Sequence, residues 1–208
     1  MGGKGFCNIN ACGVSKDFCR RELLPLWKKI TDIYAYRRKK KILMLDSDII
    51  FYRNPLLLVQ WAQGLDKKNY FMDDYKNFYA LSNDECFNRY GLVPRKRVNS
   101  GLICMNPDAL SHMFLSEYVN GVLKICEDRL VEMHCSDQTY YALLFNMLNV
   151  RKNVSRLPTD YFLFAKHTIG HLPVPENPIC IHYTGLFMRS MYTDGLRLLQ
   201  KERFFTLS

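Results

Sequence analysis

The 208-residue sequence contains no apolar run that approaches the roughly 20 residues a helix needs to span a membrane. Its first residues, MGGKGFCNINACGV, also lack the charged start and the apolar core of a secretory signal peptide. As written, the sequence therefore predicts a cytoplasmic protein with no transmembrane segment. A further segment upstream of Met1 would change this prediction to the secretory pathway or the Golgi.

The eight cysteines have no paired spacing, and the sequence contains no CxxC motif. A chain of this length does not need a disulfide framework, so we expect most of them to be buried free thiols. One segment does contain zinc-ligand residue types, at His167, His171, Cys180 and His182. Its spacing matches no common zinc module, which argues against a structural zinc site.

Acidic residues are scarce, because 29 basic residues against 20 acidic ones give a formal net charge of +9. A basic surface suits nucleic acid, an anionic membrane or an anionic small substrate such as a nucleotide diphosphate. No recognisable nucleic-acid-binding motif accompanies the charge, so we do not expect a nucleic-acid partner. The basic run at 37–41 is typical of a solvated loop, whereas Arg95, Lys96 and Arg97 precede an apolar strand of functional interest.

Hydrophobic residues make up 48% of the sequence, and their spacing alternates between strand-like and helix-like patterns. The patterns predict strands at 42–45, 70–72, 98–105 and 179–182, and helices at 18–35, 55–64, 107–130, 136–149 and 193–201. This alternation is typical of an α/β fold, and we predict a single domain over residues 1–208 with an irregular N-terminus at 1–17. Residues 42–45 are apolar on both faces, which predicts a central strand of a covered parallel sheet.

Two acids end this strand, in the run KILMLDSDII. Residues two apart on a strand project to the same side, so Asp46 and Asp48 can converge while Ser47 points away. The carboxyl end of a central strand is where open α/β sheets bind ligands. Two carboxylates there suit Mg²⁺ or Mn²⁺, and the alternative is an acidic strand end that faces water.

Three later motifs sharpen the interpretation of the acid pair. Residues 99–101 (NSG) open a strand, residues 137–138 (DQ) begin a helix, and residues 182–185 (HYTG) follow a strand. In this order and spacing, together with LDSD at 45–48, the set resembles the GT-A fold nucleotide-sugar glycosyltransferases, and most closely family 8, the group of glycogenin and the bacterial lipopolysaccharide galactosyltransferases. The resemblance covers residues 18–190 and implies a GT-A-like, Rossmann-like mixed sheet flanked by helices.

The resemblance also implies a role for each motif residue. Asp46, Asp48 and His182 would bind the metal, Asn99, Ser100 and Gly101 would line the donor sugar, and Asp137 and Gln138 would face the reacting sugar or the acceptor hydroxyl. Arg97, Gly185 and Arg189 would assist binding of the donor diphosphate. Without the resemblance, His182 is typical of a satisfied strand histidine and Asp137 of an acid in the first turn of a helix.

The implied activity is transfer of a sugar from a nucleotide-diphosphate donor, a UDP-sugar in the first instance, to a hydroxyl of a glycan, lipid or protein acceptor. The resemblance further implies retention of anomeric configuration and dependence on Mn²⁺ or Mg²⁺, since a cation would neutralise the charge that grows on the leaving diphosphate. The sequence leaves open whether the protein forms a homo-oligomer.

Two features depart from the family pattern. Met188 stands where the family usually supplies a lysine to the diphosphate, so Arg189 would have to take its place. Only 45 residues precede Asp46, fewer than the base-binding βα units of the family need, so we expect a fold truncated at its N-terminus with an unpaired strand edge. These features support an alternative, a catalytically inactive pseudo-transferase that serves as a binding module.

A second alternative is a haloacid-dehalogenase-type phosphatase, because the run ILMLDSDII also resembles the first motif of that class. Under that interpretation Asp46 would be the nucleophile and Asp48 a general acid. The later acidic pair of that class would have to be Asp73-Asp74, which follows the first motif too soon.

Overall fold

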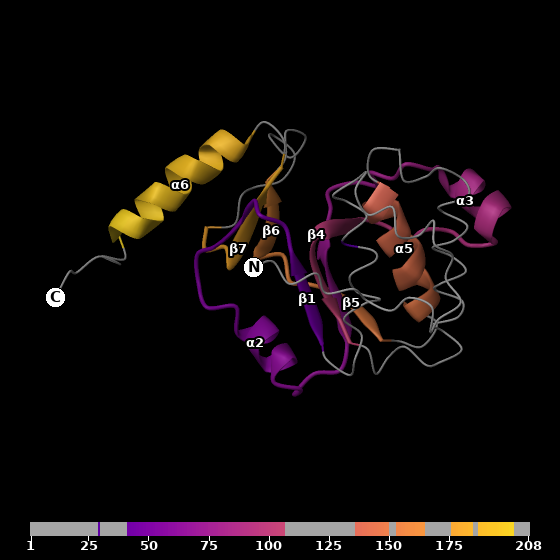
Figure 1. Ribbon diagram of the computed structural model, residues 1–208, viewed down its shortest axis with the longest axis horizontal. Coiled ribbons are helices and arrows are strands. Elements are labelled where there is room, and N and C mark those ends of the chain that lie inside the picture. The colour runs from indigo at the N-terminus through magenta and orange to yellow at the C-terminus, as the bar shows by residue number, and fades with distance from the viewer. Residues whose placement is uncertain are drawn as a thin grey trace, which may run out of the picture.

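The computed structural model describes residue 29 and residues 41–106, 136–149, 153–164, 176–184 and 187–201 (Figure 1). Along the chain these contain β1 (Ile42–Leu45), β2 (Ile49–Phe51), α2 (Leu56–Ala62), β3 (Asn69–Asp73), α3 (Asn83–Tyr90), β4 (Val98–Met105), α5 (Ser136–Asn149), β5 (Val154–Arg156), β6 (Tyr161–Phe164), β7 (Cys180–Tyr183) and α6 (Met188–Lys201). Lys29 is helical, but the rest of the helix predicted at 18–35 and the helix predicted at 107–130 lie outside the described residues. Within the described ranges, no helix combines the length and the apolar character needed to cross a membrane.

The strands form two sheets of mixed orientation. One sheet has the order β1-β4-β3-β5, in which β4 runs antiparallel to β1 and β3 while β5 runs parallel to β3. The other has the order β2-β7-β6, in which β7 runs antiparallel to β2 and parallel to β6. In Figure 1, α3 and α5 lie on one side of the four-stranded sheet, and α2 lies with the three-stranded sheet on the other. The predicted mixed sheet with flanking helices is therefore confirmed.

The prediction of a central, parallel position for β1 is wrong, whereas the terminal position of β1 in the described sheet agrees with the expected unpaired strand edge. Instead of lying in the centre of a parallel sheet, β1 is the terminal strand of the described four-stranded sheet and pairs there only with β4, in antiparallel register. Its side chains alternate, because Ile42 and Met44 are half-buried while Leu43 and Leu45 are 40% and 45% exposed. In the described part of the chain, the apolar run therefore reflects one packed face and one open face of the terminal strand of the sheet.

Strand β4 separates two hydrophobic cores. On one face Ile103 packs in a cluster with Phe145 of α5. On the other face Leu102 and Cys104 pack in a cluster that includes Trp61 of α2 and residues of β6 and β7. Because successive side chains of a strand point to opposite faces, the buried run of β4 contributes to both cores and holds the two sheets and α5 in one body.

Helix α3 is absent from the predicted elements, although both of its ends carry clear sequence signals. The side chain of Ser82 accepts a hydrogen bond from the Glu85 N–H, and the Glu85 carboxylate accepts one from the Ser82 N–H, which is a capping box. Gly91 ends the helix with a positive φ of 67°. Strands β2, β5 and β6 were also not predicted, since each is too short to show a period of two.

A bulge in β4 shapes the edge of the sheet that carries the NSG motif. Phe71 of β3 pairs with Ile103, but the next residue, Met72, pairs with Asn99. Residues 100–102 are therefore inserted on β4 at this point, where the register shifts. Irregularities of this kind bend a strand and redirect its side chains, and here Asn99 lies beside His182 of β7 and Ser100 beside the start of α5.

Replacement of Phe145 by alanine is expected to lower the free energy of unfolding by about 3–5 kcal/mol. Its ring is fully buried and stacks on Phe71, with centroids 5.2 Å apart, so truncation leaves a cavity between α5 and the sheet. The matched control is Phe87→Ala in α3, where the ring is 58% exposed and the change should stay within about 0.5 kcal/mol. Urea denaturation of the two variants and the wild type measures both values, and equal losses would contradict the described packing of α5.

Candidate active site

The acid pair lies in the turn between β1 and β2 rather than on a strand. The N–H of Asp46 donates to the carbonyl of Gly101 on β4 at 2.8 Å, and the N–H of Tyr183 on β7 donates to the carbonyl of Asp48 at 2.8 Å. Because β1 and β2 belong to different sheets, this turn crosses from one sheet to the other. Ser47, between the two acids, is exposed.

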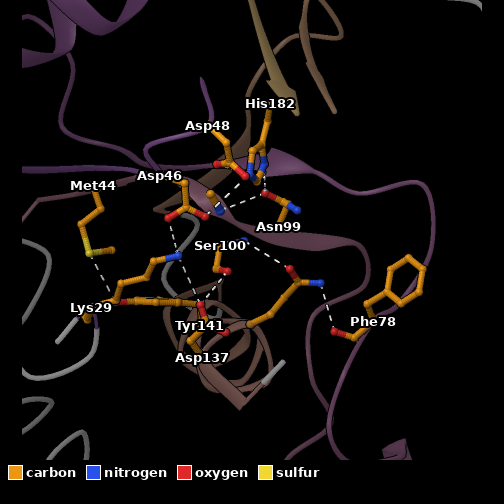
Figure 2. Close-up of polar contacts among 12 residues, drawn as sticks. Lys29, Met44, Asp46, Asp48, Phe78, Asn99, Ser100, Asp137, Tyr141 and His182 are labelled. Carbon is orange, nitrogen blue, oxygen red and sulfur yellow. Dashed lines mark hydrogen bonds and ion pairs between the residues drawn. The ribbon is translucent and has the colours of Figure 1, made fainter. Parts of the chain in front are cut away.

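Three predicted metal ligands converge at this crossing. One ligand atom each from Asp46, Asp48 and His182 lies within 4.8 Å of the other two (Figure 2). The Nε2 atom of His182 is 3.0 Å from Oδ1 of Asp48 and 3.7 Å from Oδ2 of Asp46. The imidazole is 3% exposed, whereas both carboxylates remain half-buried and reachable from solvent.

The two carboxyl groups differ in their electrostatic surroundings. Burial raises the pKa of Asp46 above its ordinary value, against the lowering effect of the Lys29 charge and hydrogen bond. Burial also acts to raise the pKa of Asp48, but the hydrogen bond and charge of His182 outweigh it, and the pKa of Asp48 lies below its ordinary value. The acid pair therefore has one member that favours the charged form more strongly than the other.

Asn99 fixes the orientation of the His182 ring. The Oδ1 atom of Asn99 accepts the N–H of Gly101 at 2.9 Å and lies 3.1 Å from Nδ1 of His182. Since this oxygen can only accept, Nδ1 of His182 carries a proton and donates it. When Nδ1 alone is protonated, the lone pair of Nε2 faces the two carboxylates, as a bound cation would require. Without a cation, a proton on Nε2 donates to Asp48 instead, and this is the hydrogen bond that lowers the pKa of Asp48.

Gly101 is required by the position of His182. A Cβ atom at residue 101 would lie 2.2 Å from Cε1 and 2.4 Å from Nδ1 of the His182 ring, and 2.9 Å from Oδ1 of Asn99. These separations are far below van der Waals contact, so no other residue fits here without displacing the imidazole. This glycine was predicted to line the donor sugar, and in the structure it admits the ring of a candidate ligand residue.

Lys29 connects the acid pair to the start of α5. Its ammonium forms an ion pair with Oδ1 of Asp46 and lies 3.4 Å from Oδ2 of Asp137, which also accepts the hydroxyl of Ser100 at 2.9 Å. Asp137 is buried, with 4% exposure. Lys29 was not among the predicted site residues, and no local pattern distinguishes it from the other lysines of the chain.

Asp74 is a second functional candidate, which the sequence suggested only for the phosphatase interpretation and not for the glycosyltransferase site. Its carboxylate is buried at the end of β3, where Oδ2 accepts Nδ2 of Asn99 and Nε2 of Gln138, each at 3.2 Å. Gln138 also donates to the carbonyl of Phe78 at 3.0 Å, and its Oε1 faces the N–H of Ser100 at 3.4 Å. The two amides that were predicted for separate motifs thus meet at one carboxylate.

The remaining predicted residues do not join this cluster. Arg97 has a positive φ of 61°, and its guanidinium binds the carboxylate of Asp73 and the carbonyl of Asp74. Arg189 is exposed and lines a hollow between α6 and β7 together with Tyr183. Gly185 lies outside the described residues. The diphosphate-binding roles of these three residues stay predictions.

Comparison with known proteins assigns the chain to a family. The family model of glycosyl transferase family 8 matches residues 29–187. Among solved structures, the apo form of mouse xyloside xylosyltransferase 1 has a TM-score of 0.50 and 13% sequence identity over 76% of this chain and 62% of that chain. The glycosyltransferase GlyE of Streptococcus pneumoniae has a TM-score of 0.48 and 18% identity over 86% of this chain and 45% of that one. No match was found among curated protein sequences.

The chain spans less than two thirds of the length of either solved structure. At 13% identity the xylosyltransferase shows a shared GT-A type of fold and no more. The family match begins at Lys29 and includes every predicted site residue except Arg189. It also removes the phosphatase interpretation, which rested on the acid pair alone. The chain belongs to glycosyltransferase family 8.

Proposed function

We propose that this protein transfers a sugar from a nucleotide-diphosphate donor to an acceptor hydroxyl, with a divalent cation held by Asp46, Asp48 and His182. The observation that carries the proposal is the convergence of these three side chains, from the β1–β2 turn and from β7, in a chain of family 8. A UDP-sugar as donor, a glycan, lipid or protein as acceptor, and retention of anomeric configuration follow from the family resemblance and belong to the same proposal.

The donor set supports Mn²⁺ as the cation, with Mg²⁺ as the alternative. Two carboxylates are hard oxygen ligands, and a neutral imidazole with its lone pair on Nε2 is a borderline ligand that Mn²⁺ accepts. When fully ionised, Asp46, Asp48 and Asp137 exceed the ammonium of Lys29 by two negative charges, which a divalent cation would balance. When bound, the cation would supply positive charge to the leaving diphosphate.

The residues around the metal site would hold the donor sugar. Lys29 lies between Asp46 and Asp137, so its ammonium bridges the two carboxylates and offsets their mutual repulsion, and it can also donate to a sugar hydroxyl. The hydrogen bond from Ser100 to Asp137 fixes the carboxylate in a buried position before any ligand arrives. Pre-organised charged groups of this kind act on charge that develops during bond cleavage without further rearrangement.

Thermal unfolding with UDP, GDP and their sugars, in Mn²⁺ and again in EDTA, tests the proposal. A ligand at 100 times its dissociation constant adds about 2.7 kcal/mol, which should raise Tm by about 5–10 °C for a chain of this size. We expect the rise with one class of nucleotide, in Mn²⁺ only. Release of free nucleotide from the matching nucleotide-sugar, with and without added acceptors, then measures the transfer.

Asp48→Asn should abolish the Mn²⁺-dependent rise in Tm, because it removes a charged ligand from the site. The matched control is Asp84→Asn, since Asp84 is an exposed acid in the first turn of α3 and contacts none of the site residues. A wild-type protein that unfolds cooperatively but shows no Mn²⁺-dependent shift with any nucleotide would contradict the proposed function.

Gly101→Ala should also abolish the Mn²⁺-dependent shift, although all three proposed ligands remain. The added methyl group overlaps the His182 ring, and we expect a loss of about 1–3 kcal/mol in the free energy of unfolding as the ring moves away. Gly195→Ala in α6 is the matched control, because its Cβ would meet only Ile50 Cδ1, at 3.4 Å. The control should keep the nucleotide response and gain up to about 1 kcal/mol from lower chain entropy. A nucleotide response retained by Gly101→Ala would place the cation away from His182.

A further inference from the structure

Asp74 is a buried carboxylate that none of the predicted site motifs includes. It is 2% exposed and directly follows β3, on the far side of Asn99 from His182. Its Oδ1 accepts the N–H of Tyr75 at 2.7 Å, and its Oδ2 accepts the amides of Asn99 and Gln138. Such a buried carboxylate is costly unless donors surround it, and these neutral donors come from three different segments of the chain.

The contacts of Asn99 allow only one orientation of its amide. The Asp74 carboxylate accepts and cannot donate when ionised, so the Asn99 atom that faces it must be the nitrogen. The Gly101 N–H donates and cannot accept, so the Asn99 atom that faces it must be the oxygen. Two independent neighbours thus require the same orientation, which presents Oδ1 of Asn99 to Nδ1 of His182.

The orientation of Asn99 in turn selects the tautomer of His182. An amide oxygen 3.1 Å from Nδ1 stabilises the ring with its proton on Nδ1. In that tautomer Nε2, which is 3.0 Å from Asp48, carries a lone pair and can bind a metal. The opposite tautomer would place an N–H there, which would hydrogen-bond to the carboxylate and exclude the cation.

We propose that Asp74 is a positioning residue that acts through Asn99 to hold His182 in the tautomer with Nδ1–H, so that Nε2 is ready for a metal ion. The inference rests on the metal site of the proposed function for its consequence, but its first step concerns only the three side chains. The same carboxylate also holds Gln138, so one buried acid aligns a candidate metal ligand and a candidate sugar-facing amide.

Asp74→Asn tests the inference with nearly unchanged volume. The new amide oxygen would still accept the Tyr75 N–H, and its NH₂ group would then face the NH₂ group of Asn99. Asn99 relieves this clash by turning over, which presents its NH₂ group to Nδ1 of His182 and favours the tautomer with the proton on Nε2. Long-range ¹H–¹⁵N NMR of the metal-free protein reports directly whether Nδ1 of the His182 ring carries a proton.

We expect the wild-type His182 ring to be protonated at Nδ1 and the Asp74→Asn ring to shift toward protonation at Nε2. Mn²⁺ affinity, measured by electron paramagnetic resonance of the free ion, should fall by about 10–100-fold, as is usual when the partner of a metal-binding histidine is lost. Asp73→Asn is the matched control, because Asp73 precedes Asp74 but binds Arg97 and Arg156. It should change neither the tautomer nor the affinity.

The double variant Asp74→Asn with Asn99→Asp supplies a rescue that a merely structural role would not predict. The carboxylate introduced at position 99 would again accept from Nδ1 of His182 and from the Gly101 N–H, and the amide introduced at position 74 would donate to that carboxylate. We expect the Nδ1–H tautomer and most of the Mn²⁺ affinity to return. An unchanged tautomer in Asp74→Asn, or no recovery in a folded double variant, would overturn the inference.

The two proposals fail in different ways. A wild-type protein that binds no Mn²⁺ would reject the proposed metal site, whereas the NMR comparison of metal-free proteins would still decide whether Asp74 sets the tautomer. A wild-type protein that binds Mn²⁺ while Asp74→Asn binds it equally well would reject the positioning role alone.

Discussion

The approach of the His182 ring to the backbone of Gly101 is the contact on which the rest of the site depends. The ring takes the place that any side chain at residue 101 would occupy, and β4 and β7, which carry these residues, belong to different sheets. The turn that holds Asp46 and Asp48 is bound to the same two strands by one backbone hydrogen bond each. A change in the distance between the sheets would therefore move all three candidate metal ligands relative to one another.

This junction is polar, although hydrophobic cores surround it. Asn99, Ser100, Asp137 and Gln138 are each at most 7% exposed, and each has a hydrogen-bond partner within the cluster. Such groups cost stability when they are buried, and a set of apolar residues of similar volume would fold at least as well. Asn99 contacts His182, and Asp137 is linked to Asp46 through Lys29, so this polar cluster is connected to all sides of the candidate metal site. This connection supports a functional reason for the arrangement, because stability alone does not require it.

The strands and helices that have a clear local sequence pattern could be predicted from the sequence. The bounds of β4 and α5 agree with the predictions, since an apolar strand and a helix that begins at Ser136 both have clear periodicity. Helix α6 begins at Met188 rather than at the predicted Thr193. The edge position of β1 could not be read from its four apolar residues, because pairing depends on β4, which lies more than 50 residues away in the chain.

The residues of the site also divide into those that belong to a local sequence motif, which could be predicted, and those that do not. The acid pair and His182 were predicted because each belongs to a short motif with recognisable spacing. Lys29 and Asp74 have no such motif, and they enter the site through contacts with residues distant in the sequence. Lys29 contacts Asp137, 108 positions away, and Asp74 contacts Gln138, 64 positions away. The bulge that inserts residues 100–102 into β4 was equally invisible, since the sequence NSG fits a regular strand entry as well as a bulge.

The alternation of β7 also limits what α6 can contribute to donor binding. His182 points to the acid pair, so Ile181 and Tyr183 point to the opposite face, where they line the hollow that contains Arg189. The hydroxyl of Tyr183 donates to Asp194 at 2.8 Å, which holds α6 against that face. In this arrangement β7 separates Arg189 from the candidate metal site, whereas Lys29 contacts that site directly. We therefore expect Lys29, rather than Arg189, to supply the positive side chain nearest to a bound donor.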